Sequence, residues 1–179
     1  KGEIYGAIKL YEKIISFGYN NHQISYLVGT AYLQLDNHKK AIYYLSLSLK
    51  FKNDFINAYN NRSIAYIKCN ENIKAIEDCN FVINIQSNFV SAIINKGIAL
   101  KNLKHFDKAI DCFKDAIRID ENNSEVYNNL GNVFKDKGDK DQAIKFYNKS
   151  ISLNQKNSDA YYNRGISLHE TGEYADCIK

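Results

Sequence analysis

The sequence predicts an all-α fold, a solenoid made of helix pairs, because one pattern of residues recurs every 34 positions. The pattern is clearest at the dipeptide Ala-Ile. This dipeptide begins at Ala7, Ala41, Ala75, Ala109 and Ala143, and Cys177 takes the Ala position in the last copy. No insertion or deletion interrupts the series, so chance does not explain it.

A second phase of the repeat carries a small residue followed by a large apolar one. The small position holds Gly29, Gly97, Gly131 and Gly165, and Ser63 occupies it in the remaining repeat. A large apolar residue, such as Phe134, follows three positions later, which is the spacing of one helix face. Each repeat is therefore predicted to hold a first helix marked by Gly and a second helix marked by Ala-Ile.

Turn signals separate the two helices of each repeat. One place between them holds Gly138 and Gly172, and the matching residues elsewhere are Asp36, Asn70 and Lys104. Gly, Asn and Asp tolerate the left-handed conformation that ends many helices. Ser124 and Ser158 are predicted to cap the helices that follow the second break. Each repeat is thus expected to contain two helices of roughly 12–14 residues.

The pattern predicts a single array over residues 1–179. Residues 1–21 are predicted to be the second helix of a partial repeat, full repeats follow at 22–55, 56–89, 90–123 and 124–157, and residues 158–179 begin another. Neither end shows the polar cap that a solenoid needs. We therefore expect the chain to be part of a longer protein, and its uncapped ends to permit self-association.

Composition excludes several classes of function. The net charge is only +4, and the 24 basic and 20 acidic residues are mixed along the chain, so no nucleic-acid partner is expected. No run approaches the roughly 18 apolar residues of a membrane span. No signal peptide is visible, which favours a cytoplasmic or nuclear protein. The cysteines and histidines lack metal-ligand spacing and no nucleotide-binding motif occurs, so neither cofactor, metal nor catalytic residue is predicted.

The repeat resembles the tetratricopeptide repeat (TPR) family. The unit 124–157 matches the motif best, with Tyr127, Leu130, Gly131, Phe134, Ala143 and Tyr147 on motif positions. The resemblance covers essentially the whole chain and implies a right-handed superhelix of antiparallel helix pairs. The usual Trp is replaced, mostly by Tyr, and the proline near the repeat end is absent. The RNA-reading pentatricopeptide relatives normally repeat at 35 residues, which argues against them.

The small residues of the two phases are predicted to pack where the two helices of a repeat cross. They are Gly29, Ala41, Ala75, Gly97, Ala109, Gly131, Ala143 and Gly165. Gly131 and Ala143 are expected to face each other, because a methyl group or less allows two backbones to come close. A leucine at either site is predicted to overpack the crossing, at a cost of about 1–3 kcal/mol.

The resemblance also implies a concave groove lined by the first helices. Asn61, Asn95, Asn129 and Asn163 share one phase on these helices. Side-chain amides donate and accept hydrogen bonds, so this row can grip the main chain of an extended peptide, similar to the asparagine ladder of O-linked N-acetylglucosamine transferases and the groove of kinesin light chains. The alternative is that these amides bond neighbouring helices in an Asn-rich chain. Further groove candidates are Asn60, Ile64, Ile94, Ile98, Asn128, Asn132 and Tyr162.

The predicted function is a scaffold that binds an extended peptide or protein segment in this groove. Two alternatives remain, the substrate-recruiting region of an O-linked N-acetylglucosamine transferase-like enzyme and a structural subunit of a complex. A clamp for the acidic tails of Hsp70 and Hsp90 is not favoured. That clamp needs a basic pair on its third helix, and the corresponding places hold pairs such as Ser91 and Asn95.

Overall fold

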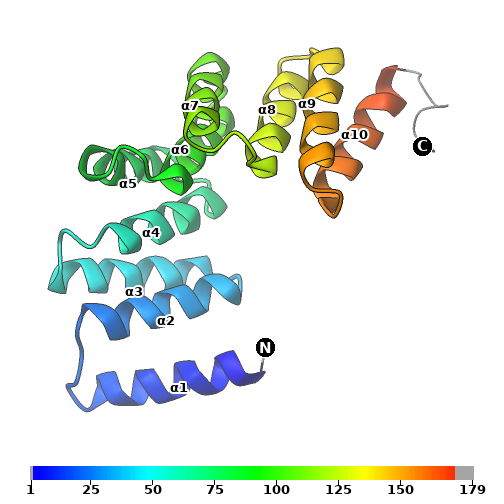
Figure 1. Cartoon of the computed structure of the whole chain (residues 1–179). Helices are drawn as coiled ribbons and strands as arrows, with labels where there is room; N and C mark the ends of the chain where they lie inside the picture. Colours follow the sequence, from blue (N-terminus) through cyan, green and yellow to red (C-terminus); the bar gives the residue numbers. More distant parts are fainter. Residues whose placement is uncertain (1, 172–179) are drawn as a thin grey trace. The chain divides into compact units, whose positions relative to one another are not determined.

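The computed structural model describes residues 2–171, and within that range the chain forms ten α-helices and no β-strand. In chain order these are α1 (Gly2–Ser16), α2 (His22–Gln34), α3 (His38–Phe51), α4 (Ile56–Lys68), α5 (Asn72–Ile85), α6 (Val90–Asn102), α7 (Phe106–Ile119), α8 (Ser124–Asp136), α9 (Lys140–Leu153) and α10 (Ser158–Thr171). Figure 1 shows them as successive hairpins. The all-α prediction is confirmed.

Helix starts follow the sequence period. The first helices α2, α4, α6, α8 and α10 begin at residues 22, 56, 90, 124 and 158, and the second helices α3, α5, α7 and α9 begin at 38, 72, 106 and 140. Each of α2 to α10 has 13 or 14 residues. The helix pair is therefore the structural unit of the repeat.

The turn between the two helices of a pair adopts a left-handed conformation at the predicted place. The φ angle is 57° at Asp36, 61° at Asn70, 61° at Lys104 and 87° at Gly138. Lys104 adopts this conformation although its side chain gives it no advantage there. The fifth such place, Gly172, lies outside the described residues.

The predicted N-caps are displaced by one residue. Ser124 and Ser158 are the first residues of α8 and α10. The side chain of Asn123 accepts a hydrogen bond from the backbone N–H of Val126 at 3.3 Å, and Asn157 accepts one from Ala160 at 3.2 Å. In both helices the Asn accepts from the N–H three residues later, so the Asn and not the following Ser caps the helix.

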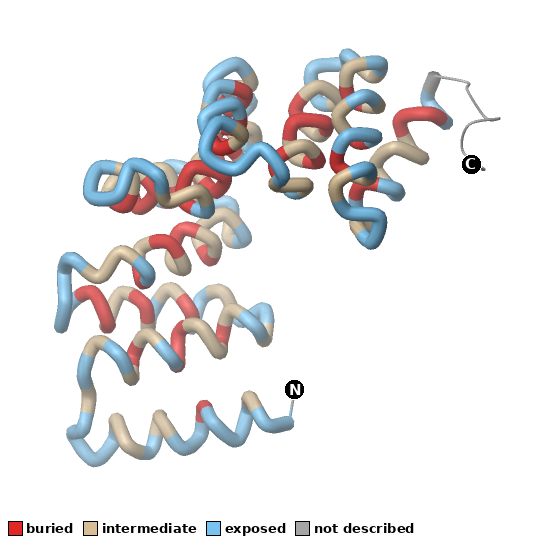
Figure 2. Tube along the Cα trace, viewed as in Figure 1, coloured by how far each residue is buried: buried red, intermediate tan, exposed pale blue. Residues whose placement is uncertain are grey.

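The chain divides into two compact units, Lys1–Ala99 and Leu100–Lys179, called here the N-terminal and C-terminal units. The division falls inside α6. Each unit has its own buried core between its helices (Figure 2). Val28, Leu45 and Val82 are fully buried in the first unit, and Phe113, Val133 and Tyr147 in the second.

Glycines at the small position admit a large side chain from the second helix. A Cβ atom built on Gly131 would lie 2.4 Å from Cε1 of Tyr147, and one on Gly29 would lie 2.7 Å from Cγ of Leu45. The predicted partner Ala143 is fully buried, but the residue closest to Gly131 is Tyr147, one turn further along α9. The expectation that Gly131 faces Ala143 is therefore corrected.

The remaining predicted packing residues are mostly buried. Ala41, Ala75 and Ala109 are completely covered, and Gly97 is buried. Gly165 is only half-buried, and an added Cβ there would meet nothing within 4 Å. The predicted second helix of its repeat falls largely outside the described residues.

Two buried serines fasten second helices to first helices. The hydroxyl of Ser48 donates to the carbonyl oxygen of His22 at 2.7 Å, and Ser150 does the same to Ser124 at 2.7 Å. The two bonds occupy the same place in two different repeats. Each bond joins the last turn of the second helix to the first residue of the first helix, at the end of the pair opposite the turn.

Helix α1 is fastened to the next hairpin through one carboxylate. Oε1 of Glu12 accepts hydrogen bonds from the hydroxyls of Tyr32 at 2.6 Å and Tyr44 at 3.0 Å. Lys40 donates to the Tyr32 hydroxyl at 3.0 Å. Burial, and then the bond to Glu12, raise the pKa of both tyrosines above the usual value, so both remain neutral donors.

Candidate functional site

The asparagine row joins the first helices of neighbouring repeats. Nδ2 of Asn61 on α4 donates to the hydroxyl of Tyr26 at 3.2 Å and to that of Thr30 at 3.1 Å, both on α2. Both amide hydrogens of Asn61 are therefore engaged inside the protein. The side chain itself is half-buried.

The same contact recurs at two further levels. Nδ2 of Asn95 donates to Oδ1 of Asn60 at 3.1 Å and to the hydroxyl of Ser63 at 3.3 Å. In the C-terminal unit, Nδ2 of Asn163 donates to Oδ1 of Asn128 at 3.2 Å. In all three cases an acceptor lies 35 positions earlier in the sequence.

These amides form one connected network in the N-terminal unit. Asn60 links its two halves, since its Oδ1 accepts from Asn95 and its Nδ2 lies 3.4 Å from Oδ1 of Asn61. Asn60 is 8% exposed and Asn95 is 9% exposed. The network therefore runs across α2, α4 and α6 largely beneath the surface, where unpaired amides would be costly.

Asn129 differs from the other three members of the row. The residue 35 positions before it is Ile94, whose side chain cannot accept a hydrogen bond. Within the C-terminal unit, the structure gives the Asn129 side chain no hydrogen bond, and the residue is half-buried on α8. Its amide is therefore the member of the row without a bond of this type inside its own unit.

The other predicted groove residues fall into three groups. Ile94 and Asn128 are buried, so their surfaces contribute little to a groove. Ile64 and Ile98 are half-buried, and Tyr162 is 71% exposed. Asn132 accepts a hydrogen bond from the buried hydroxyl of Tyr147 at 2.9 Å.

The Tyr147 hydroxyl remains a neutral donor to Asn132. Burial, together with the negative charge of Asp136, raises the pKa of Tyr147 above its usual value. Asn132 therefore supports the packing of α9 on α8.

A buried ion pair lies on the second-helix side of the N-terminal unit. Arg62 on α4 donates from Nη2 and Nε to the two carboxylate oxygens of Asp78 at 2.7 and 2.8 Å, and from Nη1 to the Ser46 hydroxyl at 3.0 Å. The guanidinium carbon lies 5.3 Å and 5.6 Å from the ring centroids of Tyr59 and Tyr66. Burial opposes the charge of Arg62, but the Asp78 carboxylate outweighs it and raises the pKa of the guanidinium.

Sequence reasoning missed this pair, although a weak signal for it exists. Arg164 stands at the same repeat position as Arg62, and its Nη1 donates to Oδ1 of Asn148 at 3.0 Å. Each arginine thus donates from Nη1 to a side chain 16 positions earlier in the sequence. The clue to this pair was that Arg62 and Arg164 occupy a repeat position that is apolar in two other repeats, at Val28 and Leu130.

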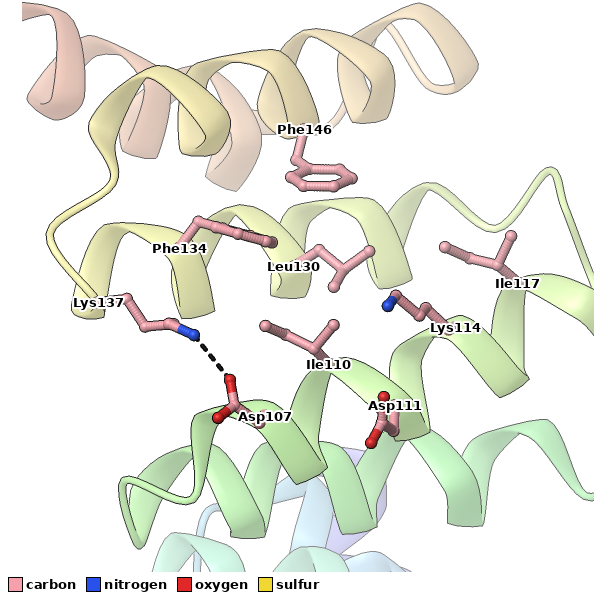
Figure 3. Close-up of a pocket in the computed structure, with 9 residues that line it drawn as sticks. All are labelled: Asp107, Ile110, Asp111, Lys114, Ile117, Leu130, Phe134, Lys137 and Phe146. Carbon is pink, nitrogen blue, oxygen red and sulfur yellow. Dashed lines mark hydrogen bonds and ion pairs between the residues drawn. The ribbon is translucent and has the colours of Figure 1, made fainter.

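The C-terminal unit contains a pocket of about 550 Å³ on its second-helix side. Figure 3 shows it between α7, α8 and α9. Its apolar wall consists of Ile110, Ile117, Leu130, Phe134 and Phe146, and its charged rim of Asp107, Asp111, Lys114 and Lys137. The rings of Phe134 and Phe146 stack at 5.2 Å. None of the rim residues was predicted to belong to a site.

One end of the pocket is closed by an ion pair. Nζ of Lys137 lies 2.7 Å from Oδ1 of Asp107, and this contact lowers the pKa of the Asp107 carboxyl. Asp107 itself is largely exposed. The pair is a surface contact of small energetic value.

Within residues 2–171, no group of three or more His, Cys, Asp or Glu side chains is arranged to hold a metal ion. None of the described helices has both the length and the apolar character required to cross a membrane.

Comparison with known proteins finds a family match in the second half of the chain. A family model described as TPR repeat matches residues 102–138 and 131–172. Comparison with curated proteins finds no match.

Solved structures share the fold over most of the chain. The crystal structure of MamA is 24% identical with a TM-score of 0.75, over 87% of this chain and 91% of that one. TTC0263, a thermophilic TPR protein of Thermus thermophilus, is 17% identical with a TM-score of 0.78, over 94% and 92%. YrrB, described as a TPR protein with an unusual peptide-binding site, is 17% identical with a TM-score of 0.72, over 90% and 83%.

Proposed function

We infer that this chain is a protein-interaction scaffold, because a TPR family model matches residues 102–138 and 131–172 and solved TPR proteins share its fold. We propose further that it binds an extended peptide or protein segment along its first helices, and that it acts by binding and not by catalysis. The TPR protein YrrB has a peptide-binding site by its own description, which supports this class of ligand. Extended peptides are commonly held through main-chain hydrogen bonds and a few side-chain anchors.

The observation that carries the proposal is that the asparagines of the row differ in whether their amides are hydrogen-bonded within the protein. The Nδ2 donors of Asn61 and Asn95 are already engaged with the preceding first helix. These amides hold neighbouring repeats in register and so shape the surface on which a peptide lies. Asn129, half-buried and without such a bond, is the amide that a ligand main chain would engage.

Apolar side chains on the same helices suit an uncharged ligand. Ile64 and Ile98 are half-buried and Leu27 is 45% exposed. Neither the row of asparagines nor these side chains provide the cations that a strongly acidic ligand requires. The ligand class is therefore an extended segment with apolar side chains and a regular main chain.

The test compares Asn129 with Asn61, whose amide is hydrogen-bonded to the preceding first helix. Binding peptides are first selected from a phage library of random heptapeptides on the immobilised chain. Asn129→Ala is expected to weaken the selected peptides about three- to tenfold, the value of one or two hydrogen bonds, with no loss of stability. Asn61→Ala is expected to lower the unfolding free energy by about 1 kcal/mol, because it breaks bonds between α4 and α2.

Fluorescence anisotropy and urea denaturation measure the two effects. Asn163→Ala is a matched control, because its amide is bonded to Asn128 as that of Asn61 is bonded to Tyr26. If Asn129→Ala binds every selected peptide as tightly as the native chain does, the amide row does not contact ligand. If the library gives no binders at all, the peptide-binding proposal itself fails.

A further inference from the structure

The pocket between α7, α8 and α9 has a counterpart two repeats earlier, between α3, α4 and α5. Leu130 corresponds to Arg62, Phe146 to Asp78, and Lys114 to Ser46. In the N-terminal unit, Arg62 donates hydrogen bonds to both Asp78 and Ser46. The guanidinium thus fills the space between its three helices.

The same space in the C-terminal unit lacks this filling. Leu130 has no hydrogen-bonding group that could reach both neighbouring helices, and Phe146 stacks on Phe134. Three of the five first helices carry a cation at this position, namely Arg62, Lys96 and Arg164. The exchange to Leu130 and Phe146 leaves an apolar pocket of about 550 Å³.

We propose that this pocket is a second binding site, occupied by a segment of a partner polypeptide that carries large apolar side chains next to a carboxylate. The site is separate from the first-helix row, because none of the asparagines of that row lines the pocket. It does not rest on the role proposed for Asn129.

The volume sets the number of side chains that the pocket can take. An engineered protein cavity of about 150 Å³ holds one benzene molecule, so a pocket of about 550 Å³ has room for more than one ring or branched side chain. Ligand pockets commonly fall between about 300 and 1,000 Å³. A short apolar segment fits this space better than a single side chain does.

The rim charges favour a carboxylate beside the apolar residues. Lys137 is paired with Asp107 at 2.7 Å, whereas the structure gives Lys114 no ion pair within the described residues. Figure 3 shows the ammonium end of Lys114 turned toward the apolar wall and the Asp111 carboxylate turned away from it. A ligand carboxylate would therefore meet the ammonium group of Lys114 at the mouth of the pocket.

The filled counterpart in the N-terminal unit shows which substitutions should fill the pocket. Leu130→Arg combined with Phe146→Asp and Lys114→Ser copies the filled counterpart around Arg62. Heptapeptides displayed on phage are selected on the native chain after depletion on this triple variant, so that only ligands of the pocket are retained. The selected peptides are expected to share two apolar residues next to Asp or Glu.

A charge exchange then tests the predicted contact. Lys114→Glu is expected to weaken the selected peptides about five- to tenfold, and replacing the peptide acid by Lys is expected to restore binding to this variant. Lys108→Glu is the matched control, because Lys108 is an exposed cation on the same helix outside the pocket and should leave binding unchanged. Both single variants change surface charges only, so they remain informative if the triple variant fails to fold.

Several outcomes would overturn the proposal. In one, depletion leaves no peptide; in another, the selected peptides bind the Lys114→Glu variant as tightly as the native chain. In a third, the apolar dye ANS binds the pocket while peptides do not, which would make it a small-molecule site. Peptides that need a second copy of this chain to bind would assign the surface to self-association. Asn129→Ala should leave the selected peptides unaffected, so failure here is distinguishable from failure of the first-helix proposal.

Discussion

Single residues at the helix crossings decide how closely the two helices of a repeat approach. Gly131 lies directly beneath the ring of Tyr147, and even one methyl group there would stand 2.4 Å from a ring carbon. Gly165 occupies the same phase in the next repeat, but a methyl group added there would meet nothing within 4 Å among the described residues. The two glycines therefore have different physical reasons to be present.

Substituting each glycine by alanine separates these reasons. Gly131→Ala is expected to lower the unfolding free energy by about 1–3 kcal/mol, because the ring of Tyr147 must move. Gly165→Ala is expected to raise it by up to about 1 kcal/mol, since alanine is the better helix former. Urea denaturation of the two variants measures the difference, and equal effects of the two changes would contradict the assigned packing.

At the scale of one element, α1 is attached to its unit through few contacts. Ile8 is its one residue counted among the buried core of the unit. The carboxylate of Glu12 adds bonds to Tyr32 and Tyr44 on the next hairpin. Together with Ile4, Tyr11 and Ile15, which pack partly buried against the same core, this carboxylate holds α1 on the next hairpin.

Removing the carboxylate should loosen α1. Glu12→Ala is expected to cost about 1–3 kcal/mol, because the partly covered Tyr32 and Tyr44 hydroxyls lose their acceptor. Glu3→Ala changes an exposed acid on the same helix and is expected to stay within about 0.5 kcal/mol. Thermal denaturation followed by circular dichroism measures both. A Glu12→Ala variant as stable as Glu3→Ala would show that the hydrogen bonds do not anchor the helix.

The sequence predicted the secondary-structure elements better than it predicted individual contacts or sites. The period placed the helix pairs and the left-handed residues, because every repeat carries the same signal. It placed the caps one residue late, since Asn123 and Ser124 are both good capping residues and only the structure shows which side chain reaches the N–H. It also paired Gly131 with Ala143, because spacing alone does not show that the Tyr147 ring projects back over α8.

The candidate sites were harder to predict. The shared phase of the asparagines was visible, but not the acceptors on the preceding helix, which are a hydroxyl at Tyr26 and an amide at Asn60. The pocket was missed for the opposite reason. Its defining residues, Leu130 and Phe146, are departures from what Arg62 and Asp78 do two repeats earlier, and a search for repetition passes over departures.

On the scale of the whole molecule, a repeat array is held together by contacts between neighbours. In the N-terminal unit, the helices inside the unit bury more residues than the helix at its start. In the N-terminal unit, α3 contributes four buried residues and α1 contributes one. Stability is thus expected to be uneven along the chain.

Amide hydrogen exchange should reveal this unevenness. We expect the amides of α1 to exchange faster than those of α3, because local opening of α1 exposes less apolar surface. Mass-spectrometric exchange on the intact chain resolves the two helices. Uniform protection from α1 to α3 would mean that the N-terminal unit opens only as a whole.

The bonds between first helices also bear on how such repeats can be shuffled during evolution. Donor and acceptor sit in different copies: Asn95 belongs to one repeat and Asn60 to the one before it. A duplicated or transposed copy would keep its helices yet lack a matching acceptor. The sequence shows such a mismatch, because Ile94, which cannot accept a hydrogen bond through its side chain, stands 35 positions before Asn129. Copies that look interchangeable by their period therefore have a preferred order, and recombination between them is restricted at their junctions.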